Sequence, residues 1–276
     1  MSSTAESRAA GTARIAGAFE RARAEGRAAL MPYLMGGYPD PETATAVAGA
    51  YAEAGADLVE LGVPFSDPLA DGPVIHAAAT RALAGGTGLA EVLATCRSIS
   101  AAVPVVPMCY ANMILARGPE RYAEELAHAG AAGTIVPDLP VEEAGAIGAA
   151  LRSAGLALIP LIAPTTPPER RAEICAAAEG FIYLVSDTRT TGERDRMPPR
   201  LGELIERTKT DSPVPVAVGF GIGSPEQAAE VGRVADGVII GTRLVRAVGE
   251  AGDARSAAAA VRDFLAASRE ALGSAG

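Results

Sequence analysis

The strongest constraint on the fold is a series of eight short apolar segments separated by segments with helical periodicity. The apolar segments do not alternate between apolar and polar residues, which is typical of strands buried on both faces of a parallel sheet. The helical segments are rich in alanine and glutamate, as in residues 42–54, 119–129, 142–154 and 225–232. The eight predicted strands span residues 29–35, 57–63, 103–110, 133–139, 156–162, 180–186, 215–220 and 236–241.

Strands that alternate with helices at intervals of roughly 30 residues predict right-handed βαβ units, and eight such units can close into a barrel. We therefore predict an α/β fold of the (β/α)8, or TIM, barrel type, with residues 1–276 forming a single domain. Ile15 and Phe19, at helical spacing, predict an extra N-terminal helix, and about residues 1–14 are a candidate for disorder. Residues 255–272 predict an amphipathic C-terminal helix that covers the barrel.

A doubly wound open sheet is the alternative architecture for this order of elements. Such a sheet would carry a G-x-G-x-x-G phosphate-binding turn after its first strand, and Met35-Gly36-Gly37-Tyr38 lacks that spacing. The glycine-rich turns instead follow the last predicted strands, as in barrels that bind phosphate there. This distribution favours the barrel.

The composition excludes several classes of partner. A formal net charge of -9 disfavours a nucleic acid, which is bound through clustered lysine and arginine. No apolar run approaches the ~20 residues that a membrane-spanning helix needs, so we expect no membrane partner. Three widely spaced cysteines, Cys96, Cys109 and Cys175, suggest neither a disulfide framework nor a zinc site. Reduced thiols in a cytoplasmic protein are the expected state.

Two acidic residues mark the predicted second strand and the loop after it. Glu60 lies among the apolar residues Val59, Leu61 and Val63, and Asp71 lies in the following loop. Active-site groups of a barrel lie at the C-terminal ends of the strands, so both carboxylates can face one mouth. A buried, unpaired glutamate has a raised pKa, which suits a general acid and base near neutral pH.

Both acidic residues also have a purely structural interpretation. Glu60 could form an ion pair with an arginine of a neighbouring strand. Asp71-Gly72-Pro73 could be ordinary capping chemistry at the start of a helix. The spacing alone does not decide between these interpretations and catalysis.

Glycine-rich turns follow the last three predicted strands, at Thr191-Gly192, Gly219 to Ser224 and Gly241-Thr242. Glycines let backbone N–H groups approach an anion, and barrels often bind phosphate after strands seven and eight. The pattern predicts a phosphorylated small molecule as the ligand. The plain alternative is that these glycines only serve tight turns.

The scarcity of lysine and histidine excludes two ways of cleaving a carbon–carbon bond. Lys209, the only lysine, lies in a polar helix end, which is a poor place for a Schiff base. His76 and His128 are the only histidines, too few for a histidine-rich zinc site. We predict catalysis by carboxylates, with no metal and no cofactor.

The motifs together resemble the alpha subunit family of tryptophan synthase. The resemblance runs through most of the chain and is most specific at residues 60–73, with further matches at residues 137–143, Tyr183, Thr191-Gly192, 219–222 and 224–227. It implies a lyase of tryptophan biosynthesis that cleaves indole-3-glycerol phosphate to indole and glyceraldehyde 3-phosphate by a retro-aldol reaction. In that reaction Glu60 would transfer protons, and Asp71 would bind the indole N–H and stabilise positive charge on the ring.

The resemblance also implies which residues surround the substrate. Thr191 would close over the site and bind Asp71. The phosphate would lie against Gly192, Gly221, Gly241 and Thr242. The remaining wall of the indole pocket would comprise Tyr33, Met108, Tyr110, Ile135, Leu161, Tyr183 and Phe220. For most of them the plain alternative is barrel core, above all for Ile135 and Leu161.

A beta subunit that carries pyridoxal phosphate is the partner implied by the resemblance, in an alpha2beta2 heterotetramer. The expected interface includes Pro64, Asp67, Pro68 and Asn112. One departure from the family lies in Ser186-Asp187-Thr188-Arg189-Thr190-Thr191-Gly192, where Arg189 replaces a flexible glycine and Asp187 a basic residue. This altered loop leaves two alternatives, a stand-alone indole-releasing lyase and a non-catalytic subunit that activates a partner.

Overall fold

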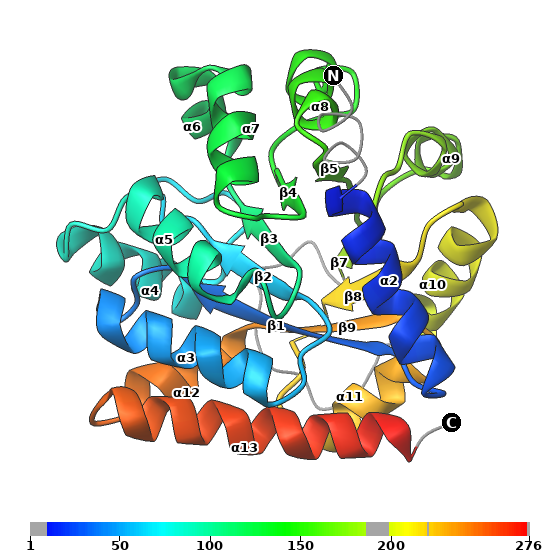
Figure 1. The fold of residues 1–276 in the computed structure, drawn as a ribbon. Helices are drawn as coiled ribbons and strands as arrows, with labels where there is room; N and C mark the ends of the chain where they lie inside the picture. Colours follow the sequence, from blue (N-terminus) through cyan, green and yellow to red (C-terminus); the bar gives the residue numbers. More distant parts are fainter. Residues whose placement is uncertain (1–9, 186–198, 220, 275–276) are drawn as a thin grey trace.

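The computed structural model describes residues 10–185, 199–219 and 221–274. Its strands form one sheet in which every recorded pair is parallel, in the order β5-β4-β3-β2-β1-β9-β8-β7-β6 (Figure 1). The predicted (β/α)8 barrel is confirmed. No helix in the described ranges is long and apolar enough to cross a membrane.

All eight predicted strands are present, but the fifth is broken. Pro160 separates β5 from β6; β5 pairs with β4 and β6 pairs with β7, so this stretch closes the barrel. Pro160 has no N–H to donate, but its carbonyl accepts a 3.0 Å hydrogen bond from the N–H of Tyr183. The strands are β1 (Ala29–Met35), β2 (Val59–Gly62), β3 (Val105–Met108), β4 (Gly133–Ile135), β5 (Ala157–Ile159), β6 (Leu161–Ile162), β7 (Ile182–Val185), β8 (Val216–Gly219) and β9 (Gly237–Ile240).

Helices surround the sheet, and the predicted N-terminal and C-terminal helices are both confirmed as α2 and α13 (Figure 1). α2 begins at Ala10, inside the stretch considered for disorder, and residues 1–9 of that stretch lie outside the described residues. α13 packs along α3, α11 and α12. The helices are α2 (Ala10–Ala24), α3 (Pro41–Glu53), α4 (Pro73–Ala84), α5 (Leu89–Ile99), α6 (Ala111–Arg117), α7 (Pro119–His128), α8 (Gly145–Ser153), α9 (Pro168–Ala176), α10 (Pro199–Asp211), α11 (Pro225–Gly232), α12 (Thr242–Glu250) and α13 (Ala254–Gly273).

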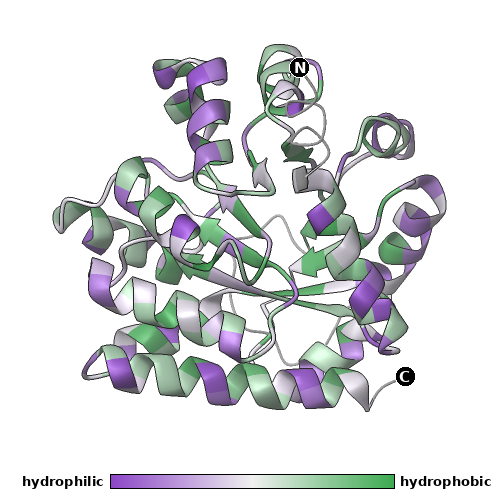
Figure 2. Ribbon diagram, in the orientation of Figure 1, coloured by the Kyte–Doolittle hydropathy of each residue, from purple (hydrophilic) through white to green (hydrophobic). Residues whose placement is uncertain are grey.

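The core has an outer layer between strands and helices and an inner layer inside the barrel. Hydrophobic residues concentrate on the central strands, and hydrophilic residues lie on the outward faces of the helices (Figure 2). Ile15 and Phe19 of α2 belong to the inner layer, where the ring of Phe19 lies 5.7 Å from that of Phe181. Helix α2 therefore covers the N-terminal end of the barrel, and functional groups are left to the opposite end.

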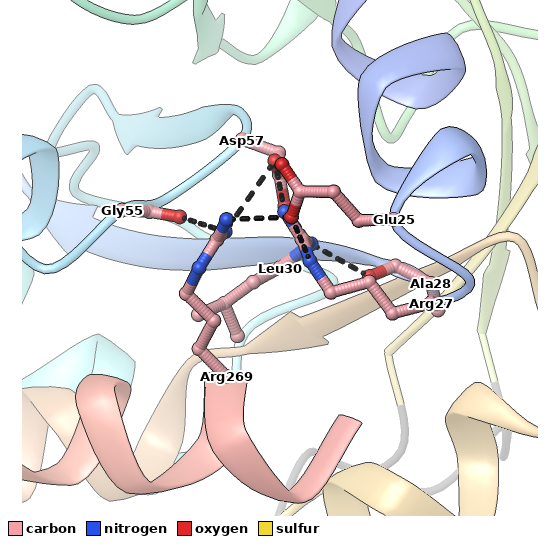
Figure 3. A network of polar contacts seen from close by, with 7 residues as sticks. All are labelled: Glu25, Arg27, Ala28, Leu30, Gly55, Asp57 and Arg269. Atoms are coloured by element: carbon pink, nitrogen blue, oxygen red, sulfur yellow. Dashed lines mark hydrogen bonds and ion pairs between the residues drawn. The ribbon is translucent and has the colours of Figure 1, made fainter. Parts of the chain in front are cut away.

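A polar network lies at the covered end of the barrel (Figure 3). Arg27 donates to both carboxylate oxygens of Asp57, over 2.5 and 2.9 Å, and Asp57 also accepts the N–H of Leu30 over 2.8 Å. Arg269 of α13 donates to the carbonyl of Gly55 and to Glu25, over 2.8 and 2.7 Å. The network joins the segments that precede β1 and β2 to the C-terminal helix.

Candidate active site

The alternation of side chains along β2 directs Glu60 into the barrel. Val59 and Leu61 lie in the outer core layer, whereas Leu58 lies in the inner layer, and successive side chains of a strand point to opposite faces. Glu60 is therefore on the inner face, in register with Tyr33 of β1. Its side chain is 1% exposed.

Glu60 has no partner for one of its carboxyl oxygens. Oε2 is buried without a hydrogen bond, and no arginine or lysine of the described part of the chain forms an ion pair with it. Burial, and secondarily the charge of Asp71, raises the pKa of Glu60 to about 8. Within those residues, the structural interpretation of Glu60 as one half of an ion pair is wrong.

Asp71 lies in the loop between β2 and α4, and the capping interpretation of this residue is wrong. Gly72 occupies the N-cap position of α4 and Pro73 the first turn, so Asp71 lies one residue before the cap. Its carboxylate instead lies near the hydroxyl of Tyr110, which accepts a 3.1 Å hydrogen bond from the N–H of the preceding residue, Ala70. Burial raises the pKa of Asp71, and the interactions with Tyr110 and with the exposed His76 oppose that rise. Glu60 and Asp71 therefore interact with each other at the mouth, but their surroundings differ.

Two tyrosines, Tyr33 and Tyr183, lie beside the carboxyl groups. Each has room for its hydroxyl only because the residue that it reaches on a neighbouring strand is a glycine. A Cβ at Gly62 would lie 2.1 Å from the hydroxyl of Tyr33, and one at Gly219 would lie 2.9 Å from that of Tyr183. Burial is the main cause that raises the pKa values of both phenols, and the charges of Glu60 and Asp71 raise them further. Gly62 and Gly219 were not predicted as site residues, although a glycine inside a strand is the signal of such a close approach.

The other predicted wall residues differ in depth. Ile135 of β4 is fully buried in the inner core layer, which supports its plain interpretation as core. Met108 of β3 and Leu161 of β6 are partly exposed and pack on top of that layer. Tyr110, directly before α6, is 3% exposed. Phe220 and Thr191 lie outside the described residues.

Three of the four predicted phosphate-binding residues are described, and they follow β8 and β9. Gly221 has a positive φ of 72°, which favours glycine. Gly241 is the N-cap of α12, buried Thr242 is its first residue, and a Cβ at Gly241 would lie 3.6 Å from Cβ of Tyr33. Because the first N–H groups of a helix lack intrahelical partners, this end can bind an anion beside the tyrosine wall. Gly192 is outside the described residues.

The predicted interface residues lie on the β2–α4 loop and on α6. Asp67 and Asn112 are exposed and Pro68 is partly exposed, whereas Pro64 is buried and offers little surface to a partner. The same two segments carry two exposed leucines that were not predicted, Leu69 (84% exposed) and Leu115 (60% exposed). A large contiguous apolar patch marks a protein interface, whereas single exposed leucines are common on protein surfaces.

Lys209 and His128 lie away from the carboxyl pair, whereas His76 lies near Asp71. Lys209 forms a 2.8 Å ion pair with Asp236, which directly precedes β9 and so lies at the end of the barrel opposite the mouth. His128 is exposed and its Nδ1 lies 2.7 Å from the carbonyl of Glu124. Within the described ranges, no group of three or more histidine, cysteine, aspartate or glutamate residues could hold a metal ion.

A cavity of about 500 Å³ lies outside the barrel wall, between α8 and α9. Its walls include Leu139, Leu158 and Ile174, and neither Glu60 nor Asp71 lines it. Ion pairs join Arg152 to Glu179 and Arg170 to Glu142 across it. We place the candidate active site at the mouth, because the unpartnered carboxyl group and the glycine turns lie there.

Comparison with known proteins agrees with this geometry. The family model described as tryptophan synthase alpha chain matches residues 19–272. A tryptophan synthase alpha chain of Prochlorococcus marinus (strain MIT 9313) is 49% identical over 237 residues, which cover 85% of this chain and 86% of that relative. One from Roseiflexus castenholzii is 50% identical over 238 residues, covering 85% and 91%.

Solved structures give the same result. A chain of tryptophan synthase from Mycobacterium tuberculosis has a TM-score of 0.87 and 39% sequence identity, covering 94% of this chain and 98% of that one. The alpha subunit of tryptophan synthase from Legionella pneumophila has a TM-score of 0.85 and 38% identity, covering 94% and 98%. The fold, the motifs and the extent of these matches together show that the chain belongs to the tryptophan synthase alpha chain family.

Proposed function

We propose that this chain is the alpha subunit of tryptophan synthase, a lyase of tryptophan biosynthesis that cleaves indole-3-glycerol phosphate to indole and glyceraldehyde 3-phosphate. One observation carries the proposal, beside the family membership. A buried carboxyl group with an unpartnered oxygen, Glu60, lies at the mouth of the barrel with a second carboxylate, Asp71, close enough to raise its pKa. A retro-aldol cleavage needs a group that first gives a proton and then takes one.

Glu60 is suited to both proton transfers. With a pKa of about 8 it holds its proton at neutral pH and can give it to C3 of the indole ring. The resulting carboxylate then takes the proton of the adjacent glycerol hydroxyl. The C–C bond breaks, its electrons return to the ring, and the hydroxyl carbon becomes the aldehyde. One proton is given and one is taken, so Glu60 ends the cycle as it began.

Asp71 has the complementary role of a fixed negative charge. Protonation of C3 places positive charge on the ring nitrogen, and a carboxylate that accepts the N–H hydrogen bond stabilises that charge. The interactions with Tyr110 and with the nearby His76 both favour the ionised form of Asp71. The different surroundings of the two carboxyl groups therefore suit one as acid and the other as anion.

Backbone groups hold the other end of the substrate in this proposal. Gly192, Gly221, Gly241 and Thr242 receive the phosphate near the start of α12, and the ring lies among Tyr33, Met108, Tyr110, Leu161, Tyr183 and Phe220, under Thr191. The 3.6 Å approach of a Gly241 Cβ to Tyr33 supports a common site for both ends. The chain needs no cofactor for these steps.

The proposed partner is a tryptophan synthase beta subunit, which carries the pyridoxal phosphate, in a cytoplasmic alpha2beta2 complex. Asp67, Pro68 and Asn112 offer exposed surface for it, beside the exposed Leu69 and Leu115. Buried Pro64 then shapes the loop instead of touching the partner.

The decisive experiment measures indole release from indole-3-glycerol phosphate by the purified chain, with and without a beta subunit. We expect slow release that the partner accelerates. Fast release without a partner would identify a stand-alone lyase. No release under either condition would contradict the proposed reaction.

A further inference from the structure

The loop that carries Asp71, residues 64–72, leaves the sheet directly after β2. The N–H of Val63 still donates to the carbonyl of Met108 on β3, over 2.9 Å, and the chain then turns away from its neighbour strand. Residues 66, 67, 69 and 70 of the loop are exposed. Because the sheet no longer holds this segment, contacts with other loops have to fix the place of Asp71.

Tyr110 contacts this loop near both of its ends. Its ring stacks on that of Phe65, with 5.1 Å between ring centroids and an interplanar angle of 28°. Its hydroxyl accepts a 3.1 Å hydrogen bond from the N–H of Ala70, the residue directly before Asp71. Tyr110 is 3% exposed. The place of the loop therefore depends on the place of this one buried side chain.

The backbone on each side of Tyr110 is bound to the next βα unit. The N–H of Cys109 donates to the carbonyl of Ile135 on β4, over 3.0 Å. The N–H of Ala111 donates to Oδ1 of Asp138, in the loop after β4, over 2.8 Å. Ala111 is the first residue of α6, where an N–H has no partner within the helix, so Asp138 supplies one from another segment. Of these two anchors, only Asp138 acts through its side chain.

We propose that Asp138 is a positioning residue, which holds the start of α6 and so places Tyr110, while Tyr110 places the loop that carries Asp71. The catalytic consequence rests on the proposed function. Asp138 belongs to the motif at residues 137–143, to which no role was assigned. A charge that is fixed before the reaction need not be reoriented during it, which is how preorganised groups stabilise a transition state.

A second acidic residue of the same loop offers a matched comparison. Glu142 is 61% exposed and forms an ion pair with Arg170 of α9, on the side of the cavity between α8 and α9. Asp138 instead reaches back to α6 through a partly buried hydrogen bond. If the loop acts only as a structural support, the two residues should affect the site alike. If the path through Tyr110 matters, only Asp138 should.

The first test compares kcat for indole release in three variants. Asp138→Ala removes the acceptor of the Ala111 N–H, and we expect kcat to fall about tenfold with a smaller change in KM, because a small displacement of a catalytic group is costly. Asp138→Asn keeps an oxygen acceptor and should restore kcat to within about threefold of the parent. Glu142→Gln should leave kcat unchanged. An unchanged kcat in folded Asp138→Ala would overturn the catalytic consequence.

A second measurement needs no turnover, and so separates this proposal from the proposed function. Hydrogen exchange of the Ala70 amide can be followed by NMR in the substrate-free chain, and Tyr110→Phe, which removes the acceptor of that amide, gives the rate without the bond. We expect Asp138→Ala to raise the exchange rate of Ala70 towards that of Tyr110→Phe, and Asp138→Asn and Glu142→Gln to keep the rate of the parent. This result supports the placement by Asp138 even if no variant cleaves indole-3-glycerol phosphate.

An unchanged exchange rate of Ala70 in folded Asp138→Ala overturns the proposal, whatever the activity, because Asp138 would then stabilise α6 alone. Circular dichroism checks the fold of each variant. If Asp138→Ala does not fold, Asp138→Ser takes its place, because the serine hydroxyl keeps a polar group at this position but extends less far towards the N–H of Ala111. The same two outcomes then decide.

Discussion

Two buried carboxyl groups three positions apart, Asp57 just before β2 and Glu60 within it, have opposite surroundings. Asp57, 7% exposed, accepts two hydrogen bonds from Arg27 and one from the N–H of Leu30. Glu60, 1% exposed, has one carboxyl oxygen with no hydrogen-bond partner among the residues that the structure describes. The first lies at the end that α2 covers and the second at the mouth.

The difference shows how one strand serves both stability and chemistry. A buried charge is tolerated when it is paired and hydrogen-bonded, and Asp57 satisfies that condition. A buried carboxyl group without a partner avoids the cost of its charge by keeping its proton, which is the case for Glu60. This division agrees with barrels in general, where the N-terminal end of the strands serves stability and the C-terminal end catalysis.

The largest expected effect is on activity, from Glu60→Gln. The amide has the same shape but can neither give nor take the transferred proton, so kcat should fall by about a thousandfold. Steady-state indole release measures it, and circular dichroism checks the fold. Asp57→Asn is the matched control, since it makes the same chemical change at the other end of the strand. Equal losses of kcat in Glu60→Gln and Asp57→Asn would contradict the assignment of catalysis to Glu60 and of stability to Asp57.

The next effect is on stability, from Asp57→Asn. It removes the carboxylate that pairs with both Nη atoms of Arg27, whose side chain is 3% exposed and keeps, among the described residues, only the half-exposed Glu25 as a charged partner, over 2.8 Å, so the free energy of unfolding should fall by about 2 kcal/mol. Urea denaturation at pH 7 measures it, and kcat of the folded protein should stay near that of the parent. Arg262→Ala is the comparison, because it breaks an exposed pair with Glu53 and should cost less than about 1 kcal/mol. A cost as small for Asp57→Asn would show that the buried pair contributes little.

A third effect is the pH dependence that Glu60 gives to stability. The pKa of Glu60 rises from 4.5 to about 8 on folding, so between these pH values the folded chain holds a proton that the unfolded chain has lost. The stability from this group is therefore complete below pH 4.5 and is lost as the pH rises to about 8. Its slope is at most about 1.4 kcal/mol per pH unit.

The measurement is urea denaturation of the parent and of Glu60→Gln between pH 5 and pH 9. Taking the difference removes the titration of all other groups. Relative to the parent, the variant should gain stability as the pH rises to about 8 and then stay level. A constant difference would mean that Glu60 titrates normally and is not held protonated by burial.

The sequence predicted the regular parts of the molecule well, because their signals are local. β1 and α11 have the predicted limits, and proline or glycine residues mark the ends of both. The fourth strand was predicted to reach Leu139 but ends at Ile135, because the apolar pattern continues into the loop that holds Asp138. Apolar composition alone cannot distinguish a strand end from a buried loop.

What the sequence could not show depends on contacts between distant segments. The hypothesis that Glu60 transfers protons required that no arginine form an ion pair with it. Only the fold could reveal that the described residues provide no such partner. Asp71 has both the spacing of a cap and that of a site, and the hydroxyl of Tyr110 that binds the N–H of the preceding Ala70 comes from a residue 40 positions further along the chain. The Arg27–Asp57 pair, 30 positions apart, was likewise not predicted. Charged pairs carry no periodicity from which such a contact could be inferred.

Because α2 covers one end of the barrel, it limits where the substrate can enter and the product can leave. Ile15 and Phe19 fill the N-terminal end of the barrel together with Phe181, so the barrel is closed at that end. A small apolar product formed beside Glu60 must leave over the same rim by which the substrate entered. Leu69 and Leu115 stand exposed on the segments that reach that rim. A partner bound at that rim would receive the product before the product reaches water, because the closed N-terminal end of the barrel offers no second exit.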